Sequence, residues 1–390
     1  RVQEVLSKMS SFAQESFSGI GVIKSYNLQR IMNQGFDDLV SESYQKNMSL
    51  FKVQAWFFPL MILLIGFSNL IVIYVGGNQY INNEIEIGVL AEFIIYVNML
   101  TWPVAVVGWI TSIVQQAEAS QERINLFLKE EPEIKDGSGV QKEIKGALEL
   151  KNVSLRYPET QIQALENISL KIPTGTTLGI LGNIGSGKST LLDLITRLYD
   201  PSEGKILLDG IDLKEYTLEQ LREAIGSIPQ NAFLFSESIE DNIRFGSINA
   251  RREAIQEASK EAVVHKNIIA FKEGYQTLLG ERGVTLSGGQ IQRVSIARAF
   301  IKDPKILLLD DCLSAVDTDT EEEILKHLKK IAQNKTTLIV SHRISSLKHA
   351  DQIIVFENGK IVQQGKHLDL TGVSGYYKEL FEKQQSDRNK

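Results

Sequence analysis

Residues 182–190 read GNIGSGKST, and this stretch constrains the fold of the chain more than any other. Residues 177–181 before it form an apolar run typical of a β-strand, and apolar residues recur at helical spacing over 191–195. A strand, a glycine-rich turn and a helix are the context in which G-x-x-x-x-G-K-[ST] binds phosphate. Glycines allow a tight turn that points successive N–H groups at phosphate oxygens, and the helix start adds its positive dipole end. The stretch therefore predicts a loop that binds the phosphates of a nucleotide.

Every residue of this loop is a candidate binding residue. Lys188 can reach the β- and γ-phosphates, and the Ser189 hydroxyl can coordinate Mg²⁺. The full set is Gly182, Asn183, Ile184, Gly185, Ser186, Gly187, Lys188, Ser189 and Thr190. An ordinary glycine-rich turn is the alternative, and the flanking strand and helix argue against it.

The N-terminal third of the chain contains two long uncharged segments. Residues 53–83 and 93–117 carry no charged side chain, and each exceeds the roughly 20 residues that span a bilayer as a helix. Both are apolar on every face, which does not suit two core helices of a water-soluble domain. We therefore expect membrane spans at about 53–77 and 88–116. The loop between them lacks Lys and Arg whereas both flanks contain them, so we expect the flanks to be cytoplasmic.

The 390 residues suggest two or three domains. We expect residues 1–134 to be the C-terminal part of a membrane domain, residues 135–144 a linker, and residues 145–390 a nucleotide-binding domain. Residues 1–52 are helical in pattern with an interruption at Gly19–Gly21, and a long helix is expected to start near Gly35 and run into the first span. The fold class is thus a membrane α-helical part followed by an α/β domain with a small antiparallel β subdomain, whose short strands are expected at 147–150, 153–157 and 168–172.

Residues 306–311, ILLLDD, predict a buried strand that ends in two acids. Such a strand end lies at the carboxyl edge of a parallel sheet, beside the phosphates. Asp310 is expected to hold Mg²⁺, and Asp311 to orient or deprotonate the attacking water. A strand that merely ends in two solvated acids is the alternative.

Residues 286–290, LSGGQ, predict a second anion site at the start of a helix. One nucleotide does not need two such sites on one chain, so we expect this one to serve a nucleotide held by another chain. The residues expected to act in trans are Ser287, Gly288, Gly289 and Gln290.

With these motifs in this order, the sequence resembles the ABC transporter ATPases. The resemblance implies that Tyr157 stacks on adenine, that Gln230 senses Mg²⁺ and couples to the membrane domain, and that His342 is the switch histidine. It further implies an exporter-specific segment at 280–283 and an interface loop at 314–317. Residues 1–130 resemble the last two of six membrane helices of an exporter half-transporter, with a coupling helix at about 11–20, so we expect the chain to be a piece of a longer protein.

One position departs from the family pattern. The residue after Asp310 is usually Glu, and here it is Asp311, whose carboxylate is one methylene shorter. A misplacement of about 1 Å can cost about 10²-fold in rate. The pattern resembles the member of a heterodimeric exporter that carries the weaker ATP site, so a heterodimer with a second half-transporter is favoured over a homodimer in which Asp311 still works.

The expected function is ATP-driven efflux of an amphipathic drug-like compound or a lipid across the cell membrane, with ATP and Mg²⁺ as cofactors and the ATPase domain in the cytoplasm. A net charge of −6 gives no reason to expect a nucleic-acid partner. Two alternatives from other classes are a DNA-associated ATPase of the chromosome-maintenance or DNA-repair type, and a membrane protein that binds ATP for regulation without pumping. The first normally separates the two phosphate motifs by a long coiled coil, which this chain lacks.

Overall fold

The computed structural model describes residues 2–280, 286–313 and 316–388, which divide into an N-terminal unit, Arg1–Glu131, and a C-terminal unit, Pro132–Lys390. Two predicted features fall partly outside the described residues. These are positions 281–283 of the exporter-specific segment and positions 314–315 of the interface loop.

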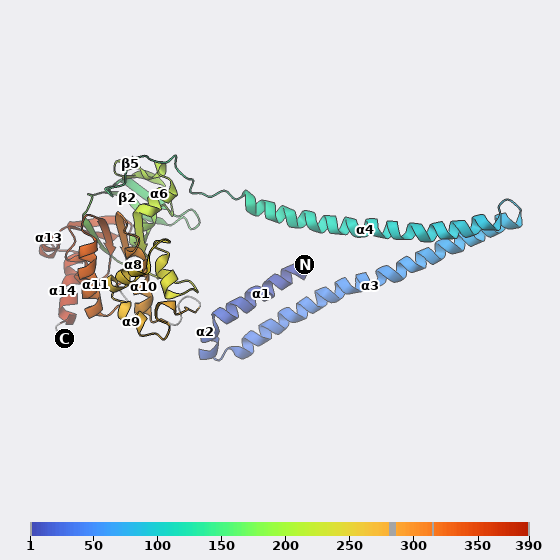
Figure 1. The fold of residues 1–390 in the computed structure, drawn as a ribbon, viewed down its shortest axis with the longest axis horizontal. Coiled ribbons are helices and arrows are strands. Elements are labelled where there is room, and N and C mark those ends of the chain that lie inside the picture. The colour runs from blue at the N-terminus through green and yellow to red at the C-terminus, as the bar shows by residue number, and fades with distance from the viewer. Residues whose placement is uncertain (1, 281–285, 314–315, 389–390) are drawn as a thin grey trace. The chain divides into compact units, whose positions relative to one another are not determined.

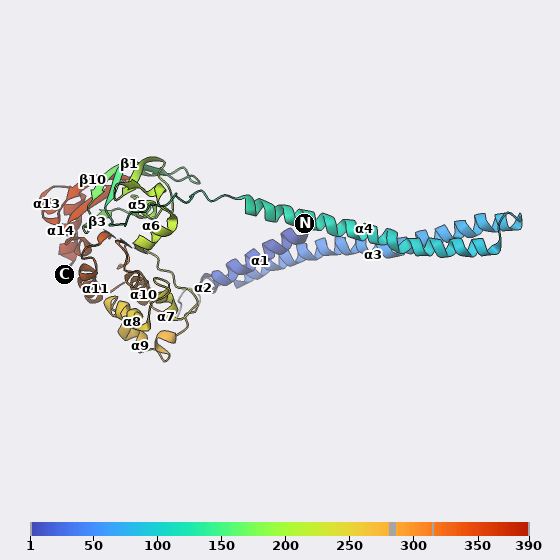
Figure 2. The same ribbon diagram turned by 45° about the horizontal axis from the view of Figure 1, so that its top comes forward.

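The N-terminal unit consists of helices α1 (Val2–Ser18), α2 (Ile20–Ser25), α3 (Gln29–Ile81) and α4 (Ile87–Lys129). Figures 1 and 2 show α1 lying alongside the first part of α3. The predicted start of α3 near Gly35 is wrong, because Gly35 lies within the helix. A Cβ at Gly35 would lie 3.3 Å from the ring of Phe12, so the glycine permits close packing of α1 on α3 and does not end a helix.

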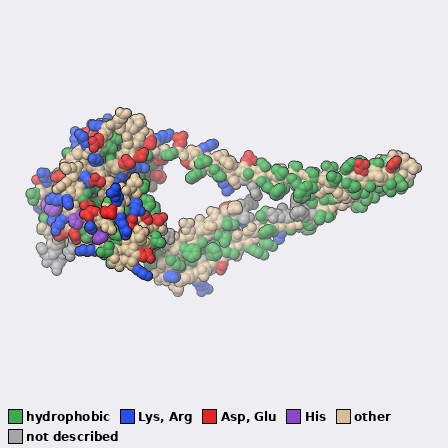
Figure 3. Space-filling view, in the orientation of Figure 1, with side chains coloured by type: hydrophobic (Ala, Val, Ile, Leu, Met, Phe, Trp, Pro, Cys, Tyr) green, Lys and Arg blue, Asp and Glu red, His purple; other side chains and the backbone are tan. Residues whose placement is uncertain are grey.

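Helices α3 and α4 are each long enough to cross a membrane. At about 1.5 Å per residue, their 53 and 43 residues extend over about 80 and 65 Å, against about 30 Å for a hydrocarbon core. Their apolar segments are Pro59–Ile81, with mean hydropathy 2.2, and Ile87–Lys129, with mean hydropathy 1.7. Hydrophobic side chains occupy much of the visible face of this helix pair (Figure 3). Such a large apolar surface on a pair of helices indicates contact with lipid or other apolar partners.

The C-terminal unit contains two sheets. A four-stranded antiparallel sheet has the order β2-β1-β4-β5, and a six-stranded sheet has the order β10-β9-β3-β8-β7-β6. In the larger sheet β9, β3, β8, β7 and β6 are parallel, and β10 is an antiparallel edge strand. The strands are β1 (Leu148–Arg156), β2 (Gln163–Ile172), β3 (Thr177–Gly182), β4 (Glu203–Leu208), β5 (Ile211–Asp212), β6 (Ile225–Ile228), β7 (Ile306–Asp310), β8 (Thr336–Val340), β9 (Gln352–Glu357) and β10 (Lys360–Gly365).

The helices of this unit connect its strands or follow the last of them (Figure 1). They are α5 (Lys188–Ile195), α6 (Leu218–Ala224), α7 (Ile239–Arg244), α8 (Arg252–Glu261), α9 (His265–Ile269), α10 (Gly288–Phe300), α11 (Thr318–Ile331), α12 (Ile344–Leu347), α13 (His367–Gly372) and α14 (Tyr376–Arg388), with the 3₁₀ turns η1 (Leu213–Glu215) and η2 (Gly274–Gln276).

Alternate residues of the parallel strands face two separate cores. In β7, Ile306 and Leu308 join a core shared with the antiparallel sheet, α5 and α6, whereas Leu307 and Leu309 join a core shared with α8, α10 and α11. Because both faces of the sheet are covered, its strands are apolar throughout and not alternating. The prediction of separate strands at 147–150 and 153–157 is wrong, since β1 is continuous. Its register shifts between Leu150 and Val153, and Asn152 in this bulge has a φ of 49°.

Candidate nucleotide-binding site

The phosphate loop joins β3 to α5, as the sequence predicts. Gly187 caps α5 with a φ of 98°, and Gly185 has a φ of 77°, so both adopt the left-handed conformation that favours glycine. A Cβ at Gly187 would lie 2.5 Å from the backbone oxygen of Ala164, whereas one at Gly185 would meet open space. Ile184 at the loop tip is 93% exposed and Asn183 is also exposed. The loop is therefore an open turn, held against β2 at Gly187, whose left-handed positions are occupied by glycine.

Polar groups of this loop are available to a phosphate. The Ser186 hydroxyl is buried without a hydrogen-bond partner among the described residues, and it lies where a Cβ on Gly182 would contact it at 2.7 Å. Among the acceptors of the described residues, none receives a hydrogen bond from the backbone N–H of Gly185 or Gly187. An orphaned hydroxyl and free N–H groups next to a helix start fit the phosphates of a nucleotide.

Lys188 points back over the loop. It is only 7% exposed, and its ammonium donates to the backbone oxygens of Gly182 at 2.9 Å and Asn183 at 2.7 Å. Burial lowers the pKa of Lys188, and the charges of Asp310 and Asp311 oppose that shift. The lysine is therefore a buried cation whose hydrogen-bond partners in the loop are neutral carbonyls. Phosphate oxygens would bind it more strongly because they carry charge.

The predicted acids lie at the end of β7, at the same edge of the sheet, with Asp310 as its last residue and Asp311 directly after it. Strands β3, β8, β7 and β6 are adjacent and parallel, so their carboxyl ends bring together the loop, His342, the two acids and Gln230. Asp310 is half-buried, while Asp311 is buried and has a φ of 44°. Burial raises the pKa of Asp311, and the charge and backbone N–H of His342 oppose the shift. The acids, His342 and Lys188 thus interact electrostatically within one site.

The predicted adenine platform and Mg²⁺ sensor occupy different surroundings. The Tyr157 hydroxyl lies 3.0 Å from the hydroxyl of Thr190, and its ring packs edge-on against Tyr199 with centroids 5.1 Å apart. Thr190 is buried and bonded to Tyr157, so its hydroxyl faces the tyrosine, whereas Ser189 is exposed. Gln230 is exposed on the loop after β6, and its backbone oxygen accepts from the Gln292 amide at 3.5 Å. These contacts fix Tyr157 and the Gln230 backbone in place.

The LSGGQ stretch forms a capping box at the start of α10. The Ser287 hydroxyl accepts from the N–H of Gln290 at 3.3 Å, and the Gln290 side chain accepts from the N–H of Ser287 at 2.9 Å. Gly288 has open space beside it. Within the described residues, no hydrogen bond or ion pair joins Ser287–Gln290 to the phosphate loop. The predicted second anion site is therefore not bonded to the phosphate loop of the same chain among the described residues.

Three residues of the site escaped sequence reasoning. Burial and the charge of Asp310 raise the pKa of Asp193 in α5. From α14, the Tyr376 hydroxyl donates to the Asn183 side chain at 2.8 Å, and the Gln384 amide donates to the His342 backbone oxygen at 2.8 Å. Only Asp193 had a sequence signal, as an acid one turn into the helix after the loop. Tyr376 is separated by 193 residues from its partner Asn183, and Gln384 by 42 residues from its partner His342.

Comparison with known proteins agrees with this geometry. Residues 165–314 match the family described as ABC transporter, and residues 1–104 match the ABC transporter transmembrane region. The multidrug resistance-like ATP-binding protein MdlA of Buchnera aphidicola is 40% identical over 98% of this chain, and the ATP-dependent lipid A-core flippase of Chromohalobacter salexigens is 34% identical over 98%. The chain spans 66% of the length of each. A solved bacterial Atm1-family ABC exporter with ATP bound matches with a TM-score of 0.89 and 28% identity, covering 98% of this chain and 69% of that one.

The two motifs, the parallel sheet and the membrane helices define a nucleotide-binding domain fused to a membrane domain. The chain belongs to the ABC transporter family and is similar to exporter half-transporters. The DNA-associated alternative is not favoured, because the membrane-region match has no counterpart in that class.

Proposed function

We propose that this chain is half of an ATP-driven exporter that moves an amphipathic compound or a lipid out of the cell. The observation that carries the proposal is the cluster at the sheet edge, where Lys188, Asp310, Asp311 and His342 lie beside a loop with free N–H groups. On ATP binding, the Lys188 ammonium would exchange its two carbonyl partners for phosphate oxygens. The similarity to proteins named as a multidrug resistance-like protein and a lipid A-core flippase supports the substrate class.

Mg²⁺ would be held by the Ser189 hydroxyl, the Asp310 carboxylate and the Gln230 side chain together with phosphate oxygens. One carboxylate with neutral oxygen donors suits this ion, which is usually bound by one or two carboxylates plus substrate phosphates. The ion would neutralise the charge that develops on the phosphates. Asp311 would orient the attacking water, and burial, which raises the pKa of Asp311, increases its affinity for the proton that the water loses. His342 would contact the terminal phosphate from the end of β8.

The transport step can be tested by reconstitution. The full-length protein with its partner is placed in liposomes with outward-facing nucleotide-binding domains, and ATP-dependent uptake of a fluorescent amphiphile and of a labelled lipid is measured. We expect one of the two to accumulate only with hydrolysable ATP. Hydrolysis that continues without movement of either would favour the regulatory alternative. The same vesicles report orientation, since ATP must act from the side that corresponds to the cytoplasm.

We further propose that two such domains close head to tail and that Ser287–Gln290 complete the ATP site of a partner half-transporter. The separation of this stretch from the chain's own phosphate loop supports action in trans. A short carboxylate at Asp311 would make the chain's own site slow. In a heterodimer, Asp311→Asn should therefore reduce ATP turnover modestly, whereas Ser287→Trp should reduce it severely by disabling the partner's site.

The structure supplies a matched control for Ser287→Trp. Thr217 and Gln220 form an equivalent capping box at the start of α6. Thr217→Trp removes that cap at a position outside the site, so it measures the combined cost of a bulky side chain and a lost cap, of which the cap contributes about 1 kcal/mol of stability. Near-total loss for both Asp311→Asn and Ser287→Trp, with turnover retained in Thr217→Trp, would rule out the heterodimer in favour of a homodimer.

A further inference from the structure

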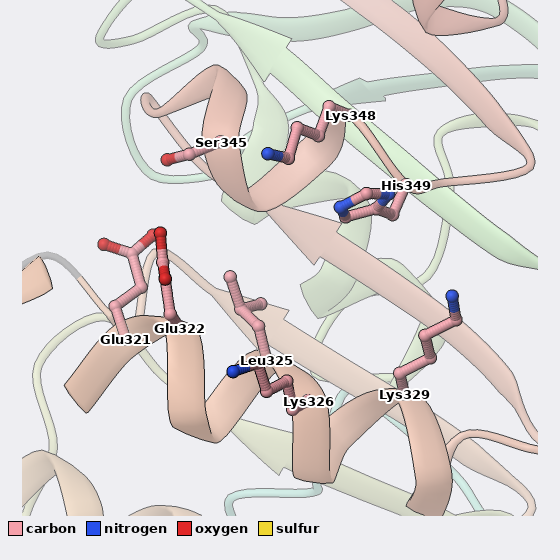
Figure 4. A pocket seen from close by; sticks show the side chains of 8 residues that line it. All are labelled: Glu321, Glu322, Leu325, Lys326, Lys329, Ser345, Lys348 and His349. Atoms are coloured by element: carbon pink, nitrogen blue, oxygen red, sulfur yellow. The ribbon is translucent and has the colours of Figure 1, made fainter. Parts of the chain in front are cut away.

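A cleft lies between α11 and the segment formed by α12 and the two residues after it. Its volume is about 310 Å³, at the lower end for small-molecule sites. Figure 4 shows that side chains of the two elements face each other across it. The lining residues are Glu321, Glu322, Leu325, Lys326, Lys329, Ser345, Lys348 and His349.

The charge of this α11–α12 cleft is predominantly positive. Lys326, Lys329 and Lys348 are exposed, and within the described chain no carboxylate lies within ion-pair distance of them. Burial, Lys348 and Lys329 lower the pKa of His349, which places this ring close to both ammonium groups.

The carboxylates of the cleft do not cancel this charge. Glu321 is 2% exposed and is bound by the Arg343 guanidinium and by the Ser346 hydroxyl, the latter at 2.6 Å. Its charge is thus compensated from outside the cleft. Glu322 alone remains against three lysines, so the cleft favours an anion.

A smaller inner cavity of about 80 Å³ adjoins the cleft, since Leu325, Lys329 and His349 line both. Its wall includes the apolar Leu328, Ala332, Ile339 and Ala350 and the hydroxyl-bearing Thr177, Thr337 and Ser346, of which Ser346 donates to Glu321. Thr337 is 0% exposed, and its hydroxyl has no hydrogen-bond partner among the residues described. A buried hydroxyl without a partner in the wall of a cavity calls for an explanation, and a polar atom of a ligand that enters the cavity would supply the missing hydrogen bond. A cavity of about 150 Å³ holds benzene, so this one has room for about three or four carbon or oxygen atoms.

We propose that the α11–α12 cleft binds a small phosphate monoester, with the phosphate at Lys326, Lys329 and Lys348 and a short hydroxyl-bearing body reaching Thr337. The inner cavity is too small for the acyl chains of a lipid, so the ligand is a free soluble ester. This site is distinct from the phosphate loop and does not depend on the proposed transport function. Helix α12 begins two residues after His342, so the ligand would lie against the segment that follows the switch histidine.

Calorimetric titration of the full-length chain tests the proposal. The chain is held in nanodiscs of neutral phosphatidylcholine with saturating Mg-ADP, which fills the phosphate loop. The probes are 4-hydroxybutyl phosphate, butyl phosphate and inorganic phosphate. We expect saturable binding, with 4-hydroxybutyl phosphate tighter than butyl phosphate by about two- to tenfold because only it satisfies Thr337. If none of the probes shows saturable binding at concentrations up to about 10 mM, the proposal is overturned.

Variants separate the two ends of the site. Lys326→Gln, Lys329→Gln and Lys348→Gln should each weaken binding about two- to fivefold, and together at least about tenfold. Lys330→Gln is the control, because this lysine of the same helix interacts with Glu261 and does not line the cleft. An equal loss in Lys330→Gln would refute a specific site.

The hydroxyl contact has its own control. Thr337→Val should abolish the advantage of 4-hydroxybutyl phosphate, and Thr337→Ser should retain it even if both variants lower stability. An unchanged advantage in Thr337→Val would contradict the placement. The titration is then repeated with phosphatidylglycerol in the nanodisc, where we expect the same affinity. A loss of affinity that disappears in the lysine variants would assign the cleft to a lipid headgroup and overturn the free ester.

Discussion

Replacing Lys188 with alanine should weaken ATP binding more than the loss of any other single side chain. The ammonium is 7% exposed and makes two charge-assisted hydrogen bonds, to the oxygens of Gly182 and Asn183. With ATP bound, two bonds to phosphate oxygens would replace them. Bonds to charged groups contribute about 1.5–3 kcal/mol each, so the gross loss is about 3–6 kcal/mol. Giving up the two bonds to neutral carbonyls, at about 0.5–1 kcal/mol each, offsets about 1–2 kcal/mol of that loss and leaves about 2–4 kcal/mol.

This energy corresponds to a rise of about 30- to 1,000-fold in the ATP dissociation constant. The assay is equilibrium binding of a fluorescent ATP analogue to the full chain in detergent, at a temperature where hydrolysis is negligible. Lys205→Ala is the control, because Lys205 is an exposed lysine of β4 outside the site. Thermal unfolding of each variant excludes loss of fold. A change below about threefold in Lys188→Ala would refute the assignment of this lysine to the phosphates.

Two further predictions concern the stability of the same site. Gly187→Ala should destabilise the C-terminal unit by about 2–5 kcal/mol, because an alanine is strained at a φ of 98° and its Cβ would meet a backbone oxygen at 2.5 Å. Gly185→Ala has open space beside it, so only the backbone strain remains and the cost should be about 1–2 kcal/mol. Denaturant titration followed by hydrogen exchange of β3 and α5 measures both, and equal costs would contradict the clash. Asp311 has its pKa raised mainly by burial, so its contribution to stability is full below its ordinary value of 3.8 and is lost as the pH rises through the raised value. The free energy of unfolding of Asp311→Asn should therefore exceed that of the parent at pH 7, and the two values should converge toward pH 4. A difference that stays constant over this range would show that desolvation of Asp311 is not the cause.

The sequence was sufficient for those parts of the protein that depend on neighbouring residues. The phosphate loop, the strand before it and the helix after it were predicted because glycine spacing and apolar period are local properties. The two membrane-length helices were predicted because their apolar runs exceed the width of a bilayer. The predicted helix start at Gly35 was wrong, because this glycine makes room for the ring of Phe12 on another helix.

Only the tertiary structure decided which segments far apart in the sequence contact one another. The order β3-β8-β7-β6 brings the loop, the acids and His342 to one edge, and no local pattern encodes that order. The hydroxyl of Tyr157 is directed to Thr190, and the backbone at His342 is held by Gln384 of the last helix. The α11–α12 cleft and the unpaired Thr337 hydroxyl likewise exist only where separate elements pack together. Local sequence fixes the conformation of short segments, whereas burial and pairing depend on which segments become neighbours in the folded chain.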